Sequence, residues 1–397
     1  MIRHTRSESI GVKTGWIPCH LVNKAVSVGL IIFNLLIVLS AAPAVAADID
    51  LGGESKLTIH GFLSQAYANA AGGIYLGIPQ DGTTDYRNTA LQFRYEYSSK
   101  DAFVIQFSEQ RLGESPVQAQ GFLGDVQLNW VFYERRLFDN TTIKVGKFPI
   151  PLGIYNEVLH VGTVLPFFRP PFGFYGDGSY TSETINGVGL YQALQMGESW
   201  GLEADLYAGG FTFIQLGLDQ NFQLAAFPTE ANDVLGGALW LYTPIEGLRI
   251  GAGGYRSTDQ NEPFPFPPDH KITHTDWWAS LDARLDRFLL QAEYRWEREG
   301  NFWTYKDYYI LGGVKLTKEL AVHAAAEFAD MEYPGFASNI KATKDYTLGA
   351  RYAFRPNLIA KGEYHLQKGY MQDDPIPDYL ADPVKVNYYI VSLAVSF

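Results

Sequence analysis

The chain has 397 residues, with 31 lysines and arginines against 43 aspartates and glutamates, and a single cysteine. Without its first 46 residues, whose composition differs from the rest, it has 27 basic residues, 42 acidic residues and no cysteine. A chain this acidic offers no basic surface to a phosphate backbone, so nucleic-acid binding is excluded. The lack of cysteine after residue 46 also excludes disulfides and cysteine-based metal or redox centres from that part.

The N-terminal residues predict an export signal. An apolar run of about 18 residues from Ala25 to Ala42 follows Lys24. It leads to Ala44-Val45-Ala46, a small-x-small sequence that is typical of a signal-peptidase site. A run of this length is also just long enough for a retained membrane anchor, which is the alternative. We therefore predict a cleaved signal peptide over 1–46 and a mature chain over 47–397.

After residue 46, a two-residue alternation predicts strands rather than helices. In Thr89–Tyr97, every second residue is mostly apolar or aromatic, and Gln92, Arg94 and Glu96 lie between them. Such a segment has one apolar and one polar face when it is extended. Sixteen segments of this kind follow one another, at about 56–68, 87–98, 102–111, 125–138, 141–148, 184–194, 199–209, 232–242, 247–256, 275–285, 287–297, 305–316, 319–329, 344–354, 357–367 and 386–397.

The connections between these segments alternate in length. Even-numbered segments are followed by turns of a few residues, such as 98–101 and 138–141, whereas most odd-numbered segments are followed by long loops, such as 149–183 and 368–385. Short turns at one end and long loops at the other are typical of a meander closed into a barrel. The sequence therefore predicts an all-β fold, a transmembrane antiparallel barrel of 16 strands.

Charge and aromatic content favour a membrane barrel over a soluble β-sandwich, which is the alternative. Ionised groups occur in mid-strand on one face, where a dry core could not hold them but a water-filled lumen can. Aromatic residues make up 56 of the 351 residues after position 46, and many lie at strand ends, as interfacial girdles require. Rows predicted to face lipid include Val126, Leu128, Trp130 and Phe132; Trp200, Leu202, Ala204 and Leu206; and Phe288, Leu290, Ala292, Tyr294 and Trp296.

The loop 149–183 is too long and too apolar for a solvated surface loop. Its side chains, such as Ile154, Phe167 and Phe174, must pack against another part of the protein. We expect it to fold into the lumen as a constriction loop, and an extracellular cap or a trimer latch is the alternative. Its ionisable residues, which we predict to line the constriction, are Glu157, His160, Arg169, Asp177 and Glu183.

Two sequence patterns could hold a metal ion. His270 and His274, beside Asp269, would need a common helix face, but four prolines precede them and favour a loop. An acidic stretch could bind calcium, although a solvated run of charges explains it as well. That stretch contains Asp373, Asp374, Asp378 and Asp382.

One sequence pattern could mark an enzyme. Gly197–Gly201 matches the nucleophile elbow, but it spans a predicted turn between two strands, whereas the motif needs a strand, a turn and a helix. We therefore predict no catalytic residue, no metal and no cofactor.

The C-terminal segment carries a family resemblance. Alternating apolar residues end on an aromatic carboxy-terminal residue, in Tyr389, Val391, Leu393, Val395 and Phe397. This pattern resembles the assembly signal of bacterial outer-membrane proteins, and Phe397 is its terminal residue. With Lys144–Phe148 leading into the long loop, the chain after residue 46 resembles a sixteen-stranded porin, broadly of the phosphate-selective-porin-like group. The absence of lysine from the loop 149–183 departs from the phosphate-selective pattern.

The resemblance implies a location in the bacterial outer membrane, among lipid and lipopolysaccharide. It also implies that the third long loop narrows the lumen and that the chain forms a homotrimer. Small residues predicted to face lipid would let barrels approach closely, namely Gly236, Ala238, Ala252 and Gly254.

The predicted function is a passive channel for small hydrophilic solutes that is weakly cation-selective or near neutral. Nine basic and ten acidic residues face the lumen in the predicted register, and the loop acids Glu157 and Asp177 would face wall bases across the narrowest part. The alternatives are an outer-membrane enzyme or adhesin built on a barrel, or a porin specific for anions or small organic acids. The predicted pore wall includes Arg94, Glu96, Arg135, Lys144, Asp282, Arg284, Glu293, Arg295, Arg351 and Lys361.

Overall fold

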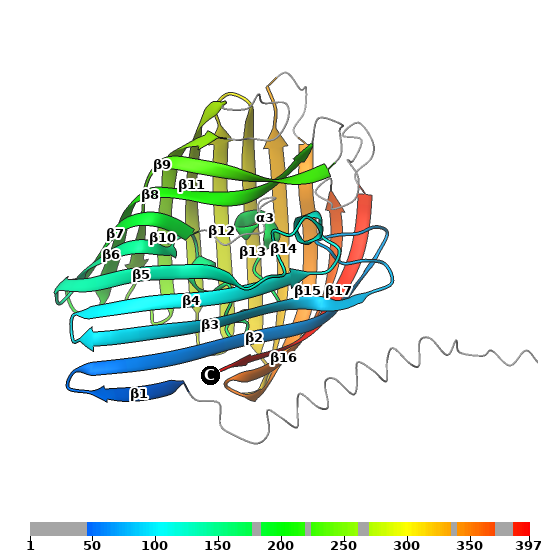
Figure 1. Cartoon of the computed structure of the whole chain (residues 1–397). Coiled ribbons are helices and arrows are strands. Elements are labelled where there is room, and N and C mark those ends of the chain that lie inside the picture. The colour runs from blue at the N-terminus through cyan, green and yellow to red at the C-terminus, as the bar shows by residue number, and fades with distance from the viewer. Residues whose placement is uncertain (1–45, 177–183, 219–223, 261–269, 335–339, 370–383) are drawn as a thin grey trace, which may run out of the picture. The chain divides into compact units, whose positions relative to one another are not determined.

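The computed structural model describes residues 46–176, 184–218, 224–260, 270–334, 340–369 and 384–397, and most of them lie in strands (Figure 1). No helix among these residues is long and apolar enough to span a bilayer. The strands are β1 (Ala47–Gly52), β2 (Ser55–Ala71), β3 (Thr83–Ser98), β4 (Asp101–Leu112), β5 (Gln127–Phe138), β6 (Thr141–Pro149), β7 (Thr184–Met196), β8 (Trp200–Leu218), β9 (Leu224–Tyr242), β10 (Leu248–Gln260), β11 (Lys271–Arg284), β12 (Phe288–Glu299), β13 (Trp303–Lys315), β14 (Leu320–Glu332), β15 (Ile340–Arg355), β16 (Leu358–Gly369) and β17 (Val384–Ser396).

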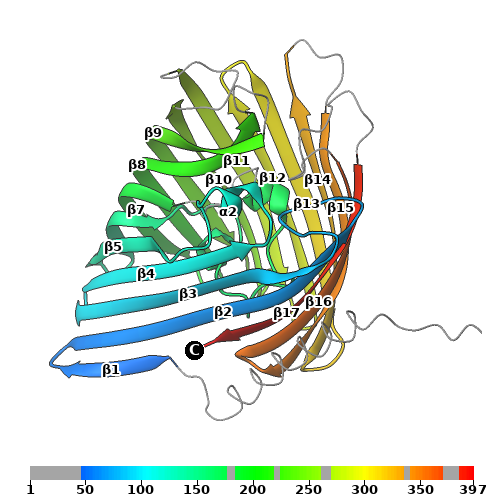
Figure 2. The same cartoon turned by 45° about the vertical axis from the view of Figure 1, so that its right-hand side comes forward.

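Strands β2 to β17 form one closed antiparallel ring of 16 strands (Figures 1 and 2). Each strand pairs with its neighbours in the chain, and β17 pairs with β2 to close the ring. Closure leaves no unpaired edge, which is what a sheet in hydrocarbon requires. The predicted barrel of 16 strands is therefore confirmed. The short β1 was not predicted; it pairs only with β2, over residues of β2 that precede those paired with β17.

The alternation places apolar side chains on the outside along most of the ring. Leu206 on β8 is 61% exposed and Phe288 on β12 is 62% exposed, as the sequence pattern predicts. Mid-strand polar side chains such as Gln291 and Glu293 point the other way and are buried inside the ring. The apolar exterior and polar interior are those of a barrel surrounded by lipid.

A β-bulge in β5 turns two predicted lipid-facing residues inward. The register between β4 and β5 shifts by one residue between Gln106 and Phe107. An extra residue in one strand reverses the alternation beyond it. Trp130 and Phe132 therefore lie on the inner face, where the ring of Phe132 packs edge-on against Phe148 with centroids 6.3 Å apart. Their predicted orientation toward lipid was wrong.

The C-terminal residue closes the seam of the ring. The backbone N–H of Gly61 donates to the carbonyl of Phe397, and the N–H of Phe397 donates to the carbonyl of Gly61, both at 3.0 Å. Any side chain on Gly61 would collide with the ring of Phe397, so the aromatic ring lies directly over this glycine. The role of Phe397 as an assembly signal stays a prediction. In the structure, Phe397 joins the last strand to β2 at the seam of the ring.

Candidate functional site

The chain between β6 and β7 packs inside the ring, and we call its described residues, 150–176, the inner loop. It contains the 3-10 helix η1 (Asn156–Val158) and the short helix α3 (Phe172–Tyr175), which lies within the ring of strands in Figure 1. Pro171 precedes α3 directly, and its fixed φ sets the direction in which the helix begins. Apolar side chains of the inner loop, including Ile150, Phe167 and Phe174, form one buried cluster with wall residues such as Trp278.

Glu293 on β12 binds the inner loop most extensively. Its carboxylate accepts hydrogen bonds from the backbone N–H of Ile154 at 2.9 Å and from the hydroxyl of Tyr175. The hydroxyls of Ser280 and Tyr309, the latter at 2.5 Å, donate to it from the wall. Glu293 is only 3% exposed, so these four hydrogen bonds replace the ones that its carboxyl group would make with water.

Two arginines hold carbonyl groups of the inner loop. Arg295 on β12 is buried, donates to the carbonyl of Phe174 at 2.7 Å and forms an ion pair with Asp276 at 2.7 Å. Arg351 on β15 donates to the carbonyl of Thr163 at 2.8 Å. Both guanidinium groups therefore donate hydrogen bonds to main-chain oxygens that would otherwise be buried without a partner.

Strand β16 binds two adjacent residues of the inner loop with opposite charges. The ammonium group of Lys361 donates to the carbonyl of Phe167 at 2.6 Å, and the carboxylate of Glu363 accepts from the N–H of Phe168 at 2.8 Å. Both side chains are buried. We refer to Glu293, Arg295, Arg351, Lys361 and Glu363 as the anchor residues.

Most of the anchor residues were predicted to line the pore wall, but in the structure they bind the inner loop. Four predicted wall residues, Glu293, Arg295, Arg351 and Lys361, bond to the inner loop, and three of them are buried. Their hydrogen-bond partners on the inner loop include main-chain groups, which no sequence pattern reveals. Hydrogen bonds to the inner loop therefore occupy charges that the sequence pattern assigns to the lumen.

Two more predicted wall residues form a separate network near the turns. Asp282 on β11 accepts from Arg249 at 3.1 Å, from Arg284 at 3.1 Å and from Gln291 at 2.8 Å. Asp282 is buried whereas Arg284 is exposed. The structure thus places Asp282 between two arginines, Arg249 and Arg284.

Early strands carry the remaining predicted wall residues. Arg94 on β3 donates to Glu96 at 2.7 Å and to Glu134 on β5. The bulge in β5 puts Arg135 on the opposite face from Glu134, where it is exposed and lies 3.3 Å from Asp101 at a turn. Arg135 was predicted to point inward, but it points outward in the structure. The cause is the same bulge in β5 that turns Phe132 inward.

The residues predicted to line the constriction are placed differently from one another. Glu157 is exposed on the inner loop and lines a small cavity with Lys144, Tyr191 and Asp205 of strands β6 to β8. Arg169 donates to the hydroxyl of Tyr86 at 2.5 Å, and its guanidinium lies 5.5 Å from the centre of that ring. Asp177 and Glu183 lie outside the described residues, as do Asp269 and the acidic stretch 373–382.

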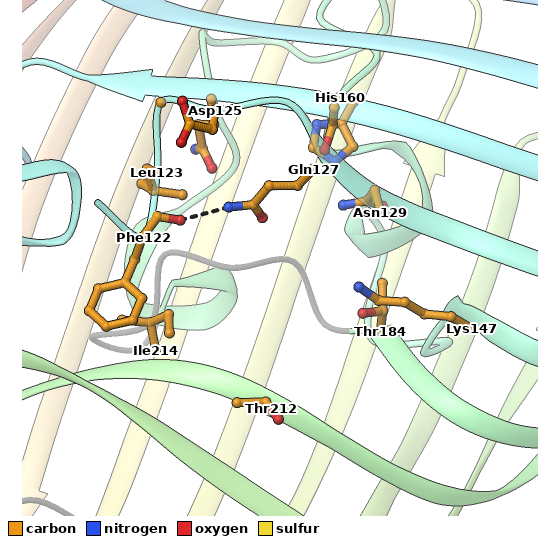
Figure 3. A pocket seen from close by; sticks show the side chains of 13 residues that line it. Phe122, Leu123, Asp125, Gln127, Asn129, Lys147, His160, Thr184, Thr212 and Ile214 are labelled. Atoms are coloured by element: carbon orange, nitrogen blue, oxygen red, sulfur yellow. Dashed lines mark hydrogen bonds between the residues drawn. The ribbon is translucent and has the colours of Figure 1, made fainter. Parts of the chain in front are cut away.

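A larger cavity of about 230 Å³ lies where β5 and β6 part (Figure 3). Pairing of β5 with β6 begins at Val131 and Lys147, while β5 continues along β4 for several residues in the other direction. Polar side chains dominate the lining, and Figure 3 shows Asp125, Gln127, Asn129, Lys147 and His160 around the space. The cavity and the one beside Glu157 both lie between the inner loop and strands β4 to β8.

Comparison with protein-family models and with curated protein sequences gives no match. Solved structures do match: OmpF of Salmonella typhi, at 13% identity and a TM-score of 0.60, covers 88% of this chain and 100% of its own. The outer-membrane channel DcaP of Acinetobacter baumannii, at 10% identity and a TM-score of 0.59, covers the same shares. A trimer form of OmpT from Vibrio cholerae, at 12% identity and a TM-score of 0.54, covers 87% and 100%. The chain has a porin-like fold. The narrower resemblance to the phosphate-selective-porin-like group stays a prediction.

The inner loop of this porin-like barrel buries a histidine, His160. Its Nδ1 lies 2.8 Å from Oδ1 of Asn88 on β3, and the amide of Asn88 donates to the carbonyl of Leu159 at 3.2 Å. Burial lowers the pKa of His160 to about 4 because the charged imidazolium would lose its hydration. The ring is therefore neutral at pH 7, with the proton on Nδ1.

We expect this burial to make the folded barrel less stable in acid. A histidine in an unfolded chain has a pKa near 6.5, so between about pH 6.5 and pH 4 only the unfolded state takes up this proton. The shift is worth up to about 3 kcal/mol, lost progressively as the pH falls through that window. The thermal midpoint of the heat-modifiable gel shift should fall between pH 7 and pH 4.5, and by less in His160→Gln.

His60 on β2 provides the control for this experiment. It is half-buried and stacks on Phe62, with ring centroids 6.4 Å apart. The variant His60→Gln should keep the wild-type loss of stability with pH. Equal slopes in the wild type and in His160→Gln would show that the burial of His160 has no thermodynamic consequence.

Proposed function

We propose that the protein is an outer-membrane porin, a passive channel for small hydrophilic solutes that needs no catalytic residue. The observation that carries this proposal is the inner loop, which the anchor residues bind along the β12 to β16 side of a ring with an apolar exterior. A loop bound inside a barrel narrows the lumen to a size that discriminates among solutes. The same proposal includes export of the chain by a signal peptide over residues 1–46. Of these residues, 1–45 lie outside the described part.

Solutes would pass between the inner loop and strands β4 to β8. The loop's wall hydrogen bonds described above are concentrated on β12 to β16, and both cavities beside the loop border on the other side of the ring. The larger cavity has the polar lining that hydrated solutes require. This route also keeps the buried anchor residues away from the permeating solute.

A channel along this route should be weakly selective for cations. The anchor residues are excluded from the count, because their charges are bound to the inner loop. Exposed or half-buried ionisable groups that remain on the route include more acids than bases, which attracts cations slightly. These groups are Asp125, Glu134, Glu157, Glu203 and Asp205 against Lys144 and Lys147.

Ion currents through the purified barrel in a planar bilayer test the proposal. A porin gives stepwise conductance increases that scale with the salt concentration, and a KCl gradient should give a small reversal potential of the sign for cation preference. Folded protein that inserts without conductance would exclude a channel. Strong anion selectivity would instead support the alternative of an anion-specific porin.

A homotrimer is the assembly that we propose. Ala252 and Gly254 on β10 are on the outer face, and Gly237 on β9 pairs with Gly254, so this patch allows close approach of a second barrel. Gly236 and Ala238 were predicted for the same patch, but they share the inner face with Tyr255 and Trp278. The mass in mild detergent, measured by light scattering, should be that of three chains, and a monomeric mass would contradict the trimer.

A further inference from the structure

Three adjacent strands bring a histidine and two carboxylates together inside the barrel, at the ends that carry the long loops. His274 on β11 pairs directly with Glu299 on β12, and Asp259 lies near the end of β10, the neighbour on the other side. All three side chains are buried, with His274 only 6% exposed. One nitrogen of His274 and one oxygen of each acid lie within 4.8 Å of one another.

The imidazole of His274 lies between two carboxylates but makes no short contact with either. Its Nδ1 is 3.6 Å from Oδ2 of Asp259, and its Nε2 is 3.8 Å from Oε2 of Glu297. Among the described residues, the buried Nε2 has no hydrogen-bond partner. The ring stacks on Tyr255 with centroids 5.6 Å apart, which fixes its plane. At 3.6 Å from Asp259, Nδ1 is too far for a direct hydrogen bond to that carboxylate, and this spacing leaves room for a ligand between the two groups.

The buried acidic side chains around His274 favour the binding of a cation. Asp259, Asp276, Glu297 and Glu299 are all buried, and the nearby basic side chain that pairs with two of them is Arg295. Carboxylates that are buried this close together repel one another, and a bound cation would lower that cost. A divalent ion would supply two positive charges at one point.

We propose that Asp259, His274 and Glu299 bind one divalent transition-metal ion, with Zn²⁺ as the best fit. Donor atoms around a tetrahedral zinc with bonds of about 2.1 Å lie roughly 3.4 Å apart, which is close to the 3.6 Å between His274 and Asp259. An imidazole ligand favours Zn²⁺ over Ca²⁺ and Mg²⁺, which prefer ligands made entirely of oxygen. Three protein ligands leave the fourth position to water.

The surroundings of the three ligands support this arrangement. The hydroxyl of Ser257 donates to Oδ1 of Asp259 at 2.5 Å, which orients the carboxylate so that Oδ2 is the atom nearest His274. When Nδ1 of His274 binds the metal, Nε2 carries the proton and points toward Glu297. Metal-binding histidines commonly donate their second N–H to a carboxylate in this way. Arg295, 2.9 Å from Glu297, links the site to the inner loop through the carbonyl of Phe174.

Zinc binding to the folded barrel in detergent tests the site. The metal-free protein is equilibrated by dialysis with Zn²⁺, and bound metal is counted by elemental analysis. We expect about one Zn²⁺ per chain in the wild type, and no competition from Ca²⁺ at the same concentration. His274→Gln should raise the dissociation constant by at least about 10- to 100-fold, the range typical for the loss of even an outer-shell partner.

His270 gives the matched control, because it is the nearest other histidine and lies outside the metal cluster. It is half-buried just before β11 and packs edge-on against Phe302. His270→Gln should bind zinc like the wild type. A heat-modifiable gel shift reports folding of each variant, and Asp259→Asn replaces His274→Gln as the test if that variant does not fold.

Three results would overturn the proposal. The first is a folded wild type that retains no zinc, which would mean that protons neutralise the cluster. The second is unchanged binding in a folded His274→Gln or Asp259→Asn variant. The third is equal loss in His270→Gln, which would place the metal on His270 and His274 together. Channel currents are independent of all three results, so failure here leaves the proposed function standing.

Discussion

Replacing Glu293 with alanine is expected to release the inner loop and to raise the single-channel conductance. The carboxylate satisfies four buried donors, from Ile154, Tyr175, Ser280 and Tyr309. The N–H of Ile154 keeps a second acceptor, the hydroxyl of Tyr175 at 2.7 Å, so Tyr175 is the donor of the loop that loses its acceptor. A buried donor left without a partner costs about 1–3 kcal/mol, and the variant loses about that much of loop binding, while the loss at Ser280 and Tyr309 destabilises the wall. A loop that leaves the wall part of the time no longer narrows the lumen continuously, and the current should become both larger and noisier.

Planar-bilayer recordings together with the thermal midpoint of the gel shift measure this effect. Glu319→Ala is the control, since it removes one negative charge from an exposed turn between β13 and β14. That variant should have wild-type conductance and nearly wild-type stability. If Glu293→Ala also conducts like the wild type, the inner loop is held without this carboxylate and does not set the pore size.

Glu157→Gln is expected to shift the reversal potential toward anions. Glu157 is the exposed acid of the inner loop, and it shares a cavity with Lys144 and Asp205. A unit charge about 5 Å from an ion is worth roughly 1–3 kcal/mol between the dielectric of water and that of a protein surface. Even half of the lower value after screening changes a permeability ratio by about twofold. Lys144→Gln should shift the potential in the opposite direction.

Glu198→Gln is the control for net charge, because Glu198 lies in an exposed turn between β7 and β8. It should leave the reversal potential unchanged. The sequence paired Glu157 with Asp177 in this role, but Asp177 lies outside the described residues, so the test rests on Glu157 alone. A shift of the same size in Glu198→Gln would mean that overall charge, rather than the cavity beside the loop, determines selectivity.

The number of strands and their order could be predicted from the sequence because both depend on local patterns. Alternation shows one strand at a time, as in Thr89–Tyr97, and the lengths of connections show which ends of the strands bear loops. Closure follows from an even count and from the need to satisfy backbone groups in lipid. None of these inferences requires knowledge of contacts between distant residues.

The orientation of individual side chains was less predictable, since one extra residue reverses it. Nothing around Trp130 in the sequence marks the bulge that turns it and Phe132 inward. An assumed parity also failed for Gly236 and Ala238 on β9, where small residues alternate with one another and the pattern carries no polarity. Period-two reasoning is reliable only where the two faces differ strongly in character.

The candidate site depended on contacts that a linear pattern does not contain. Lys361 and Arg295 look like pore-lining charges until their hydrogen bonds to main-chain carbonyls of the inner loop are known. The cluster around His274 was missed because its partners come from the strands on either side, and Asp259 and Glu299 are far from each other in the sequence. The sequence directed attention to His270 instead, which is only four residues away.

The distribution of the anchor residues along the chain also determines when the inner loop can be fixed in place. The inner loop precedes Lys361 and Glu363 by almost 200 residues, and Thr163 binds the hydroxyl of Ser396 at 3.1 Å, 233 residues later. Contacts of such long range form slowly, because the intervening chain must first be ordered. The inner loop therefore cannot acquire all of its native contacts until β16 and β17 have joined the ring. A chain truncated before β16 would contain the whole loop and the anchor residues of β12 and β15, but it would lack Lys361 and Glu363, so we expect the loop to be held along only part of its length until the last strands are in place.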